Sequence, residues 1–402
     1  MRDLQPTAAR SESVRRANLT SVLRTLHLGG PATRSGLVAA TGLTRSAIGA
    51  LVGELSELGF VEEQPSTSGG SPGRPSPIVR PRPDNVVLAL EVLVDSIGVA
   101  LMALGGELLA LERRDRPRAD TPPDRTVRDL TGMVAATLDR IDMPMRIFGI
   151  GMAVAGVVRD HATVVFAPNV GWSEVPIARL LEEALGWGLP VAVGNDADMG
   201  ALGESRRGAA AGCDDVVYVS GEVGVGGGII AGGRPLVGTA GYAGEIGHVP
   251  VVPDGQPCKC GSWGCWETEV GEGALLQRCG HRPEGGRPAV DDVLARAADG
   301  DAEILAAMEE HGRWIGYGLA GLVNVFDPAL VVLGGMFARI HPFVAPALTR
   351  ELAARVFDEV RAQTAVVPAG LGVDAPLVGA AEWVWDGVLA DPQSALPYRA
   401  RA

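Results

Sequence analysis

The chain has 402 residues, of which 47% are hydrophobic and 21% are charged. It is therefore too long for one typical domain of ~150 residues and too apolar for a disordered tail. The 55 glycines and 28 prolines are typical of a globular α/β chain with many tight turns. Aromatic residues make up only 4%, which argues against a stacking surface for single-stranded nucleic acid.

The net charge of −13 is distributed unevenly along the chain. Residues 1–83 contain 10 arginines against 6 acidic residues, whereas the remainder carries 25 basic and 42 acidic residues. A basic head in front of an acidic body predicts that only the head binds a polyanion.

The sequence predicts no membrane partner. No apolar segment of the kind found in secretory signals is visible at the start, and the most apolar long window, residues 86–106, contains Glu91 and Asp95. We expect buried strands in that window. Five cysteines, three of them within eight residues, favour a metal site over disulfides, so we expect a reducing, cytoplasmic location.

The head is predicted to hold three helices. Apolar residues recur at helical spacing over residues 13–28, which predicts the first helix. Thr33 is suited to cap a second, short helix that ends at Gly42, and Thr44 to cap a third. Helix, tight turn and helix form the helix-turn-helix pattern, with a plain three-helix packing unit as the alternative.

The recognition helix of such a motif enters the DNA major groove by its N-terminal residues. In this sequence these residues are Thr44, Arg45, Ser46 and Gly49. Their side chains are short or basic, as close approach to phosphates and base edges requires. Residues 64–77, rich in Gly and Pro, fit the tip of a β-wing that exposes Arg74. A flexible linker would have the same composition, but next to these helices we prefer the wing.

The acidic body shows a repeated α/β pattern. Apolar runs predict strands over residues 86–92, 99–103, 147–154, 191–193, 216–219, 227–230 and 330–333. The first two form a hairpin, a helix is expected around residues 129–141, and the fourth strand ends at Asn195-Asp196. Two successive α/β units with a crevice between them suit a ligand clamped between lobes.

A metal site is the most specific signal in the sequence. His248 is followed ten residues later by Cys258, and then by Cys260 and Cys265 in a Cys-x-Cys-Gly-x-x-Gly-Cys run. Three thiolates and one imidazole are the ligand set of a closed tetrahedral zinc site. Because protein groups fill all four positions, we expect one structural zinc per chain. Unliganded buried thiols are the alternative, and Cys279 is expected to be one.

These residues resemble the ROK family of sugar kinases and sugar-responsive repressors. The similarity rests on Glu245-Ile246-Gly247-His248, the cysteine run with Glu267 two residues after it, Asn195-Asp196-Ala197 and the glycines of residues 224–228. It covers essentially the whole chain, because the repressor branch, with its xylose- and N-acetylglucosamine-type members, carries an N-terminal winged helix-turn-helix.

The resemblance implies an α/β fold in which the winged helix-turn-helix precedes a duplicated, actin-like (ribonuclease-H-type) two-lobe body. It divides the chain into a DNA-binding domain over residues 1–83, a first lobe over 84–200 and a second lobe over 201–402. The C-terminal helices are expected to return to the first lobe. A homodimer or a dimer of dimers is implied as the assembly.

The same resemblance implies that sugar hydroxyls are bound by Asn195, Asp196, Glu245, His248 and Glu267. Gly156 and Asn169 lie in stretches that resemble the family's sugar-side loops. Carboxylates and an amide that bond vicinal hydroxyls discriminate sharply between sugars, because unmatched polar partners are costly. His248 can bind zinc through one ring nitrogen and offer N–H to a sugar through the other.

Enzymatic activity must be weighed, because Asp196 matches the base of the ROK kinases. Where those kinases have a glycine-rich phosphate loop after a strand, residues 90–96 contain no glycine, and the second phosphate loop carries Glu222, which would repel a triphosphate. We therefore expect no kinase activity but a repressor of carbohydrate uptake or catabolism genes that binds operator DNA and a sugar. Two alternatives remain: a sugar kinase with a DNA-binding head, and a DNA-binding protein whose body serves dimerisation or protein partners without a sugar.

Overall fold

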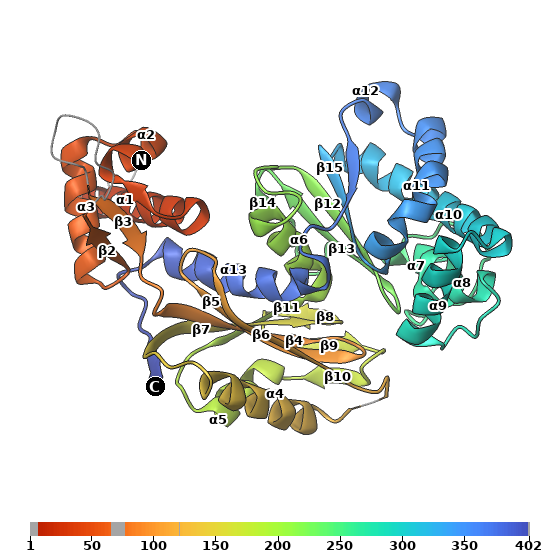
Figure 1. Cartoon of the computed structure of the whole chain (residues 1–402), viewed down its shortest axis with the longest axis horizontal. Helices are drawn as coiled ribbons and strands as arrows, with labels where there is room; N and C mark the ends of the chain where they lie inside the picture. The colour runs from red at the N-terminus through yellow and green to blue at the C-terminus, as the bar shows by residue number, and fades with distance from the viewer. Residues whose placement is uncertain (1–6, 66–76, 120, 401–402) are drawn as a thin grey trace, which may run out of the picture.

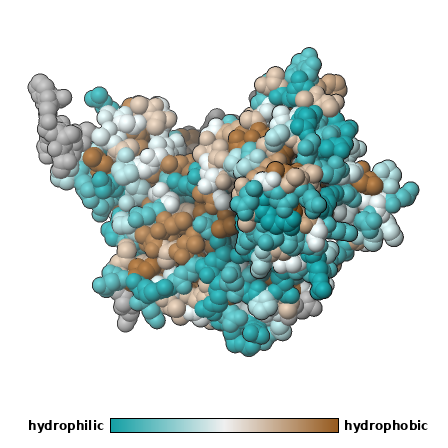
Figure 2. Space-filling model, turned by 45° about the vertical axis from the view of Figure 1, so that its right-hand side comes forward, coloured by the Kyte–Doolittle hydropathy of each residue, from teal (hydrophilic) through white to brown (hydrophobic). Residues whose placement is uncertain are grey.

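The computed structural model describes residues 7–65, 77–119 and 121–400. A small N-terminal unit, the head (residues 7–81), lies beside two lobes that are each built on a β-sheet (Figure 1). Arg74 and the predicted wing tip fall within residues 66–76 and lie outside the described residues. Figure 2 shows hydrophobic residues gathered below the head on one face, beside a largely hydrophilic lobe.

The head contains three helices and three short strands: α1 (Thr7–Gly29), α2 (Arg34–Thr41), α3 (Arg45–Glu57), β1 (Ala32–Thr33), β2 (Val61–Gln64) and β3 (Ile78–Pro81). The strands form an antiparallel sheet in the order β1–β3–β2. Both predicted caps are confirmed, since the hydroxyls of Thr33 and Thr44 accept backbone N–H groups of α2 and α3. Gly42 ends α2 at φ 71°, a left-handed conformation that glycine adopts without strain. The first helix begins six residues before the predicted start.

The first lobe holds a mixed sheet in the order β11–β7–β4–β5–β6, with β17 paired to β7. Its elements are β4 (Asn85–Val92), β5 (Ser96–Ala103), β6 (Leu108–Asp115), α4 (Pro123–Leu138), β7 (Met145–Val154), α5 (Ile177–Leu185), β11 (Val191–Asn195) and β17 (Tyr398–Ala400). A small antiparallel sheet lies beside them: β8 (Val157–Arg159), β9 (Thr163–Ala167) and β10 (Trp172–Val175). Helix α4 begins six residues before the predicted helix, because Pro123 is tolerated in a first turn.

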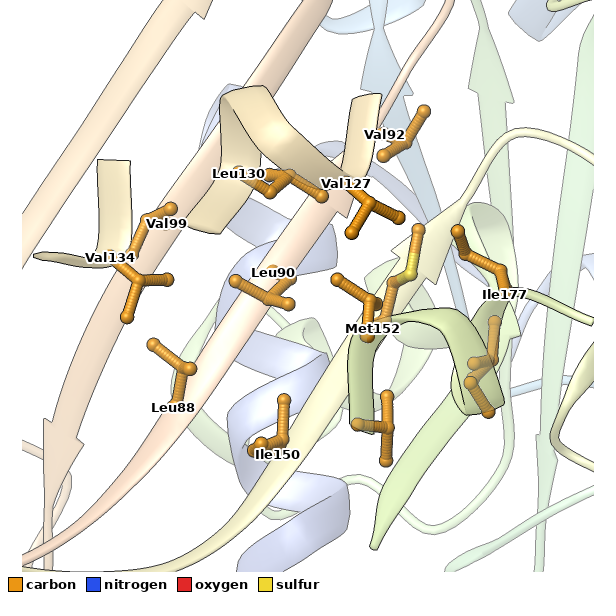
Figure 3. Packing of buried hydrophobic residues seen from close by; sticks show 14 of the residues in the cluster. Leu88, Leu90, Val92, Val99, Val127, Leu130, Val134, Ile150, Met152 and Ile177 are labelled. Carbon is orange, nitrogen blue, oxygen red and sulfur yellow. The ribbon is translucent and has the colours of Figure 1, made fainter. Parts of the chain in front are cut away.

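Both faces of this sheet are covered, which explains why its central strands are continuous apolar runs. Leu88, Leu90 and Val92 point to one face and pack with side chains of α4 and α5 (Figure 3). Val87 and Ala89 alternate to the other face and share a core with α13 (Ala375–Ala390) and the head. The head is therefore joined to the body through a continuous hydrophobic core.

The second lobe holds a five-stranded sheet in the order β14–β13–β12–β15–β16. Its strands are β12 (Val216–Gly221), β13 (Val225–Ala231), β14 (Arg234–Pro235), β15 (Leu330–Gly335) and β16 (Ala365–Pro368). Its helices are η1 (Ile246–His248), α7 (Trp266–Val270), α8 (Glu272–Arg278), α9 (Gly286–Ala298), α10 (Ala302–Phe326), α11 (Met336–Arg355), α12 (Asp358–Arg361) and η2 (Gly372–Asp374). The mixed α/β architecture agrees with the predicted fold class.

Helix α6 (Asp196–Arg207) connects the two lobes and lies against α13. The two helices approach so closely that a Cβ at Gly379 would stand 1.7 Å from the carbonyl oxygen of Met199, and one at Gly203 would stand 2.4 Å from that of Ala375. Glycine is therefore required at both positions. Figure 1 shows α13 on the first sheet, extending toward the head, although it follows the second lobe in sequence.

Among the described residues, no single helix combines the length and apolarity needed to span a membrane. The pair α2 and α3 meets that requirement only when taken together, and the two helices are bent by 112° relative to each other.

Candidate functional site

A pocket between the two lobes, the interlobe pocket, contains all seven residues that the sequence assigned to sugar binding. They are Gly156, Asn169 and Asn195 of the first lobe, Asp196 of α6, and Glu245, His248 and Glu267 of the second lobe. The residues come from segments more than 100 positions apart. The fold thus assembles, in one cavity, the set of amide and carboxylate groups that the sequence predicted.

The connection between β11 and α6 fixes two of these residues. The Oδ1 atom of Asn195 caps α6 by accepting the backbone N–H groups of Ala197 at 2.8 Å and Asp198 at 3.2 Å. Its Nδ2 atom donates to the carbonyl of Gly156 at 3.1 Å, which ties the helix to the loop after β7. Asp196 follows in the first turn, where burial raises the pKa of its carboxyl to about 7.

The second-lobe residues are linked to a cysteine cluster. Glu267 accepts the backbone N–H of Val225 through Oε2 at 3.1 Å, and its Oε1 lies 3.3 Å from Sγ of Cys258. Nε2 of His248 lies 3.8 Å from a carboxylate oxygen of Glu245. The opposite ring nitrogen, Nδ1, lies 3.6 Å from Sγ of Cys258. His248 therefore faces the pocket with one nitrogen and the cluster with the other.

The ligand atoms of His248, Cys258, Cys260 and Cys265 all lie within 4.8 Å of one another. Sγ of Cys260 lies 3.7 Å from Sγ of Cys265. A tetrahedral zinc with ordinary bond lengths separates its ligand atoms by about 3.5–3.8 Å, so the spacing fits this ion. The donor set also fits, because three sulfurs and one imidazole nitrogen suit a closed structural site. These four residues thus form a cluster that can hold a metal ion.

Lys259, the only lysine in the chain, has a contact that the sequence reasoning missed. It lies between two of the cluster cysteines and lines the interlobe pocket, and its Nζ donates to Oδ1 of Asn169 at 2.8 Å. The hydrogen bond joins the cysteine loop of one lobe to the loop after β9 in the other. The position of Lys259 inside the cysteine run was the one sequence feature that could have indicated a role at this site.

The turn between β4 and β5 lies in the segment where the sequence analysis expects no phosphate loop, and ion pairs hold it. Asp95 accepts hydrogen bonds from Arg118 at 3.1 Å and from Arg287 at 3.0 Å. Arg118 also binds both carboxylate oxygens of Glu272, in the second lobe, at 2.5 and 2.8 Å. The carboxylate of Asp95 therefore pairs with Arg118, which lines this end of the pocket, and with Arg287.

Glu222 lies in the tight turn between β12 and β13 and lines the same pocket. Burial raises the pKa of its carboxyl to about 7, and the negative charge of Asp95 adds to the shift. A second acidic group therefore lies at this end, as the sequence indicated.

The residues predicted to contact DNA lie at the start of α3. Thr44, Arg45 and Ser46 are exposed and Gly49 is half-buried. Within the part of the chain that the structure describes, the side chain of Arg45 forms no ion pair or hydrogen bond. Arg34 of α2, by contrast, is paired with Glu63 of β2 at 2.6 and 2.8 Å. Arg45 is thus the arginine available at this end of the helix.

The last turn of α6 contacts the head through a buried polar cluster that the sequence did not reveal. Arg207 donates to the carbonyl of His27 at 2.9 Å and to Oε1 of Glu382, on α13, at 2.7 Å. His27 and Glu382 are both almost fully buried, and their side chains lie 3.0 Å apart. Asp386 of α13 completes the contact, since one carboxylate oxygen binds Arg24 of the head and the other binds Arg206 of α6.

Comparison with known proteins places this chain among sugar-related repressors and kinases of one family. A model of the ROK family matches residues 87–386. The xylose repressor of Bacillus subtilis (strain 168) is 29% identical to this chain over 379 residues, covering 94% of this chain and 97% of the repressor. A glucokinase of Streptomyces coelicolor is 32% identical over 280 residues, covering 65% of this chain and 87% of the enzyme.

A crystal structure described as a ROK family transcriptional regulator, homolog of the E. coli MLC protein, superposes with a TM-score of 0.77 at 25% identity. The superposition covers 94% of this chain and 98% of the regulator. The similarity to the repressor and to the regulator thus extends over nearly the whole chain, whereas that to the glucokinase does not.

Proposed function

Because the chain belongs to the ROK family, we propose that it is a sugar-responsive transcriptional repressor, whose body binds a sugar and whose head binds operator DNA. Similarity to a xylose repressor and to a transcriptional regulator over 94% of the chain supports this function. The observation that carries it is the course of α6, which starts in the interlobe pocket at Asp196 and ends on the head at Arg207.

The effector is a neutral sugar. Among the residues that line the interlobe pocket, the acidic side chains are Asp95, Asp196, Glu222, Glu245 and Glu267. Arg118 is engaged by Asp95 and Glu272, and Lys259 by Asn169. A phosphate would meet these five acidic groups, and Lys259 is the one lining cation, among the described residues, that no carboxylate pairs with, whereas hydroxyls of a neutral sugar can donate to the carboxylates. Asn195, Asp196, Glu245, His248 and Glu267 bind the hydroxyls, with Gly156 and Asn169 closing the first-lobe side.

Helix α6 transmits binding to the head. It has 12 residues and is therefore about 18 Å long. A sugar that draws Asp196 and Glu245 together moves the first turn of α6 relative to the second lobe. Because α6 is packed tightly against α13, the movement reaches Arg206 and Arg207 as a shift of the whole element. These two arginines hold Arg24 and His27 of the head through Asp386 and Glu382, so the head changes position.

The head acts as a winged helix-turn-helix. The residues that enter the major groove are Thr44, Arg45, Ser46 and Gly49, and Arg74 contacts the adjacent DNA. One helix and one wing offer a small footprint, so a homodimer or a dimer of dimers presents paired heads to two half-sites. We divide the chain accordingly into a DNA-binding domain (1–83), a first lobe (84–200) and a second lobe (201–402), and expect it in the cytoplasm.

One structural zinc per chain is held by His248, Cys258, Cys260 and Cys265. When bound, the ion crosslinks a loop that has little apolar content of its own. Nδ1 of His248 would be its zinc-binding nitrogen, which would keep the ring oriented with Nε2 toward Glu245 and the sugar. The zinc site thereby orients one side of the effector site.

A sugar kinase with a DNA-binding head is the second candidate. One observation favours it, because Asp196, which matches the kinase base, lies in the interlobe pocket. The residues at the end of the pocket where a kinase would bind the nucleotide argue against it. Asp95 engages the arginines there, Glu222 adds a further acidic group, and residues 93–95 contain no glycine to let backbone N–H groups approach phosphates.

Two measurements on the purified chain distinguish these functions. A panel of neutral sugars is screened by thermal shift, and the same panel is incubated with Mg·ATP while ADP release is followed. The proposed function predicts a rise in melting temperature with at least one sugar and no sugar-dependent ADP release. Sugar-dependent ADP release at enzyme-like rates would establish the kinase instead, and the absence of any thermal shift would contradict a sugar effector.

A further inference from the structure

A second cavity, the side cavity, lies next to the interlobe pocket and has a volume of about 680 Å³, within the usual range of ligand sites. It lies under the exposed segment 235–245, between β11, the first turns of α6, and α13. The two cavities share four lining residues: Val157, Asn195, Gly226 and Glu245. Asn195 and Glu245 thus line both hollows.

The walls of the side cavity combine aromatic, aliphatic and acidic groups. Trp383 of α13 is half-buried, and the ring of His161 contacts its ring edge-on, with 4.7 Å between the ring centroids. Met199, Leu202 and Leu236 add aliphatic surface. The carboxyl group of Asp198 also lines the cavity and has no hydrogen-bond or ion-pair partner among the described residues. Burial raises its pKa to about 8.

This combination selects among ligand classes. No lysine or arginine occurs among the described residues that line the side cavity, so an anion such as a sugar phosphate would find no countercharge. An apolar molecule would leave the half-buried carboxyl of Asp198 unpaired. A neutral pyranose or furanose ring matches both the apolar and the polar groups of the cavity. Its C–H face packs on an indole, and its hydroxyls pair with carboxyl, amide and backbone groups.

We propose that the effector is a glycan of at least two rings, with one ring in the interlobe pocket and the next in the side cavity against Trp383 and Asp198. The inference rests on the proposed function and extends it by naming the effector class. The shared residues Asn195 and Glu245 lie where the glycosidic bond passes from one hollow to the other.

The position of the second ring also gives it an effect on the head. The residues that line the side cavity include Asp386, whose carboxylate binds both Arg24 of the head and Arg206 of α6. A ring in the side cavity therefore contacts the residue that anchors the head. A disaccharide should act on operator binding more strongly than its component monosaccharide does.

Calorimetric titration of the full chain tests the proposal. The probes are xylose with xylobiose, and glucose with cellobiose and with maltose. The expected result is that one disaccharide binds at least ~10-fold tighter than its monosaccharide, the increment that about 1.4 kcal/mol provides. Trp383→Ala and the isosteric Asp198→Asn should each remove most of this gain and leave monosaccharide affinity within ~2-fold. Trp187→Ala is the control, because Trp187 stacks on Tyr398 and lines neither cavity.

The outcomes separate this inference from the proposed function. If monosaccharides bind and no disaccharide binds more tightly, the inference is wrong while the sugar-responsive repressor stands. The same holds if the gain survives in both Trp383→Ala and Asp198→Asn. If sugars of neither length bind in this titration and none in the thermal-shift panel, the proposed function fails and the inference fails with it.

Discussion

Arg207 donates a hydrogen bond from Nη2 to the backbone carbonyl of His27 at 2.9 Å, from the last turn of the helix whose first turn lines the interlobe pocket. Its Nε also donates to Glu382 at 2.7 Å, so one guanidinium joins α6, α13 and the head. The residue touches neither the interlobe pocket nor the start of α3. It is therefore positioned to couple the two sites without belonging to either.

We expect Arg207→Gln to keep operator affinity and sugar affinity near wild type and to weaken the sugar's effect on operator binding. Allosteric coupling is typically worth about 1–3 kcal/mol, or roughly 5- to 150-fold, and in the variant it should fall to within ~2-fold. Thermodynamic linkage requires that operator DNA then change sugar affinity equally little. Arg179→Gln is the control, since among the described residues Arg179 pairs only with Glu183, on the exposed face of α5. Full coupling in Arg207→Gln would exclude this route.

Arg45→Ala and Arg74→Ala should each weaken operator binding and leave zinc content and melting temperature unchanged. Arg45 is exposed at the start of α3 and is unpaired within the described ranges, so it is available to DNA. An arginine that reads a base contributes about 1–3 kcal/mol, which corresponds to roughly 5- to 150-fold in Kd by gel shift. Arg125→Ala, on the exposed surface of α4, should bind like wild type. Unchanged affinity in both head variants would remove the winged helix-turn-helix assignment.

Cys260→Ser should reduce zinc from about one ion per chain to near zero, because it removes one of four ligands. Loss of the ion frees the ring of His248, so sugar affinity should fall together with metal content. Cys279→Ser is the matched control: this thiol is buried outside the cluster, and the variant should keep its zinc. Substoichiometric zinc in wild-type protein purified without chelators would contradict the structural site.

The pKa of Asp198, raised to about 8 by burial, predicts how stability depends on pH. Between the ordinary value near 4 and this raised value, the folded chain keeps a proton that the unfolded chain has lost. The free energy of unfolding therefore falls as pH rises through this range, by at most ~1.4 kcal/mol per pH unit for one group. Asp198→Asn removes this contribution, so the melting temperature of the variant relative to wild type should increase from pH 5 to pH 8.5. A pH-independent difference would show that Asp198 titrates normally.

Much of the sheet framework could be predicted from the sequence. Central strands buried on both faces are continuous apolar runs, and the run over residues 147–154 corresponds to β7, Met145–Val154. The short strands β8, β9 and β10 were missed, because they have three to five residues and mixed burial. Close spacing made the cysteine cluster predictable, since local chain geometry alone brings its sulfurs together.

Helix α6 shows where sequence reasoning stops. Its sequence contains two glycines and alternates charged with small residues, so no apolar stripe reveals it. The buried Glu204 is stabilised by backbone N–H groups of Ala209, Gly370 and Leu371, the last two more than 160 positions away. The bond from Arg207 to His27 likewise joins residues 180 positions apart. Such partners depend on the packing of α6 against α13 and leave no local pattern.

The central claim is that sugar binding in the body changes operator binding by the head without phosphorylation. The most direct measurement is fluorescence anisotropy of the labelled DNA upstream of this chain's own gene, titrated with the protein in the absence of ATP, with and without each neutral sugar. We expect at least one sugar to raise the operator Kd ~10-fold or more, within the usual range of allosteric coupling. Asp196→Asn and Glu245→Gln should bind the operator like wild type and fail to respond. An operator Kd that no sugar changes, or a response that persists in both variants, would contradict the account.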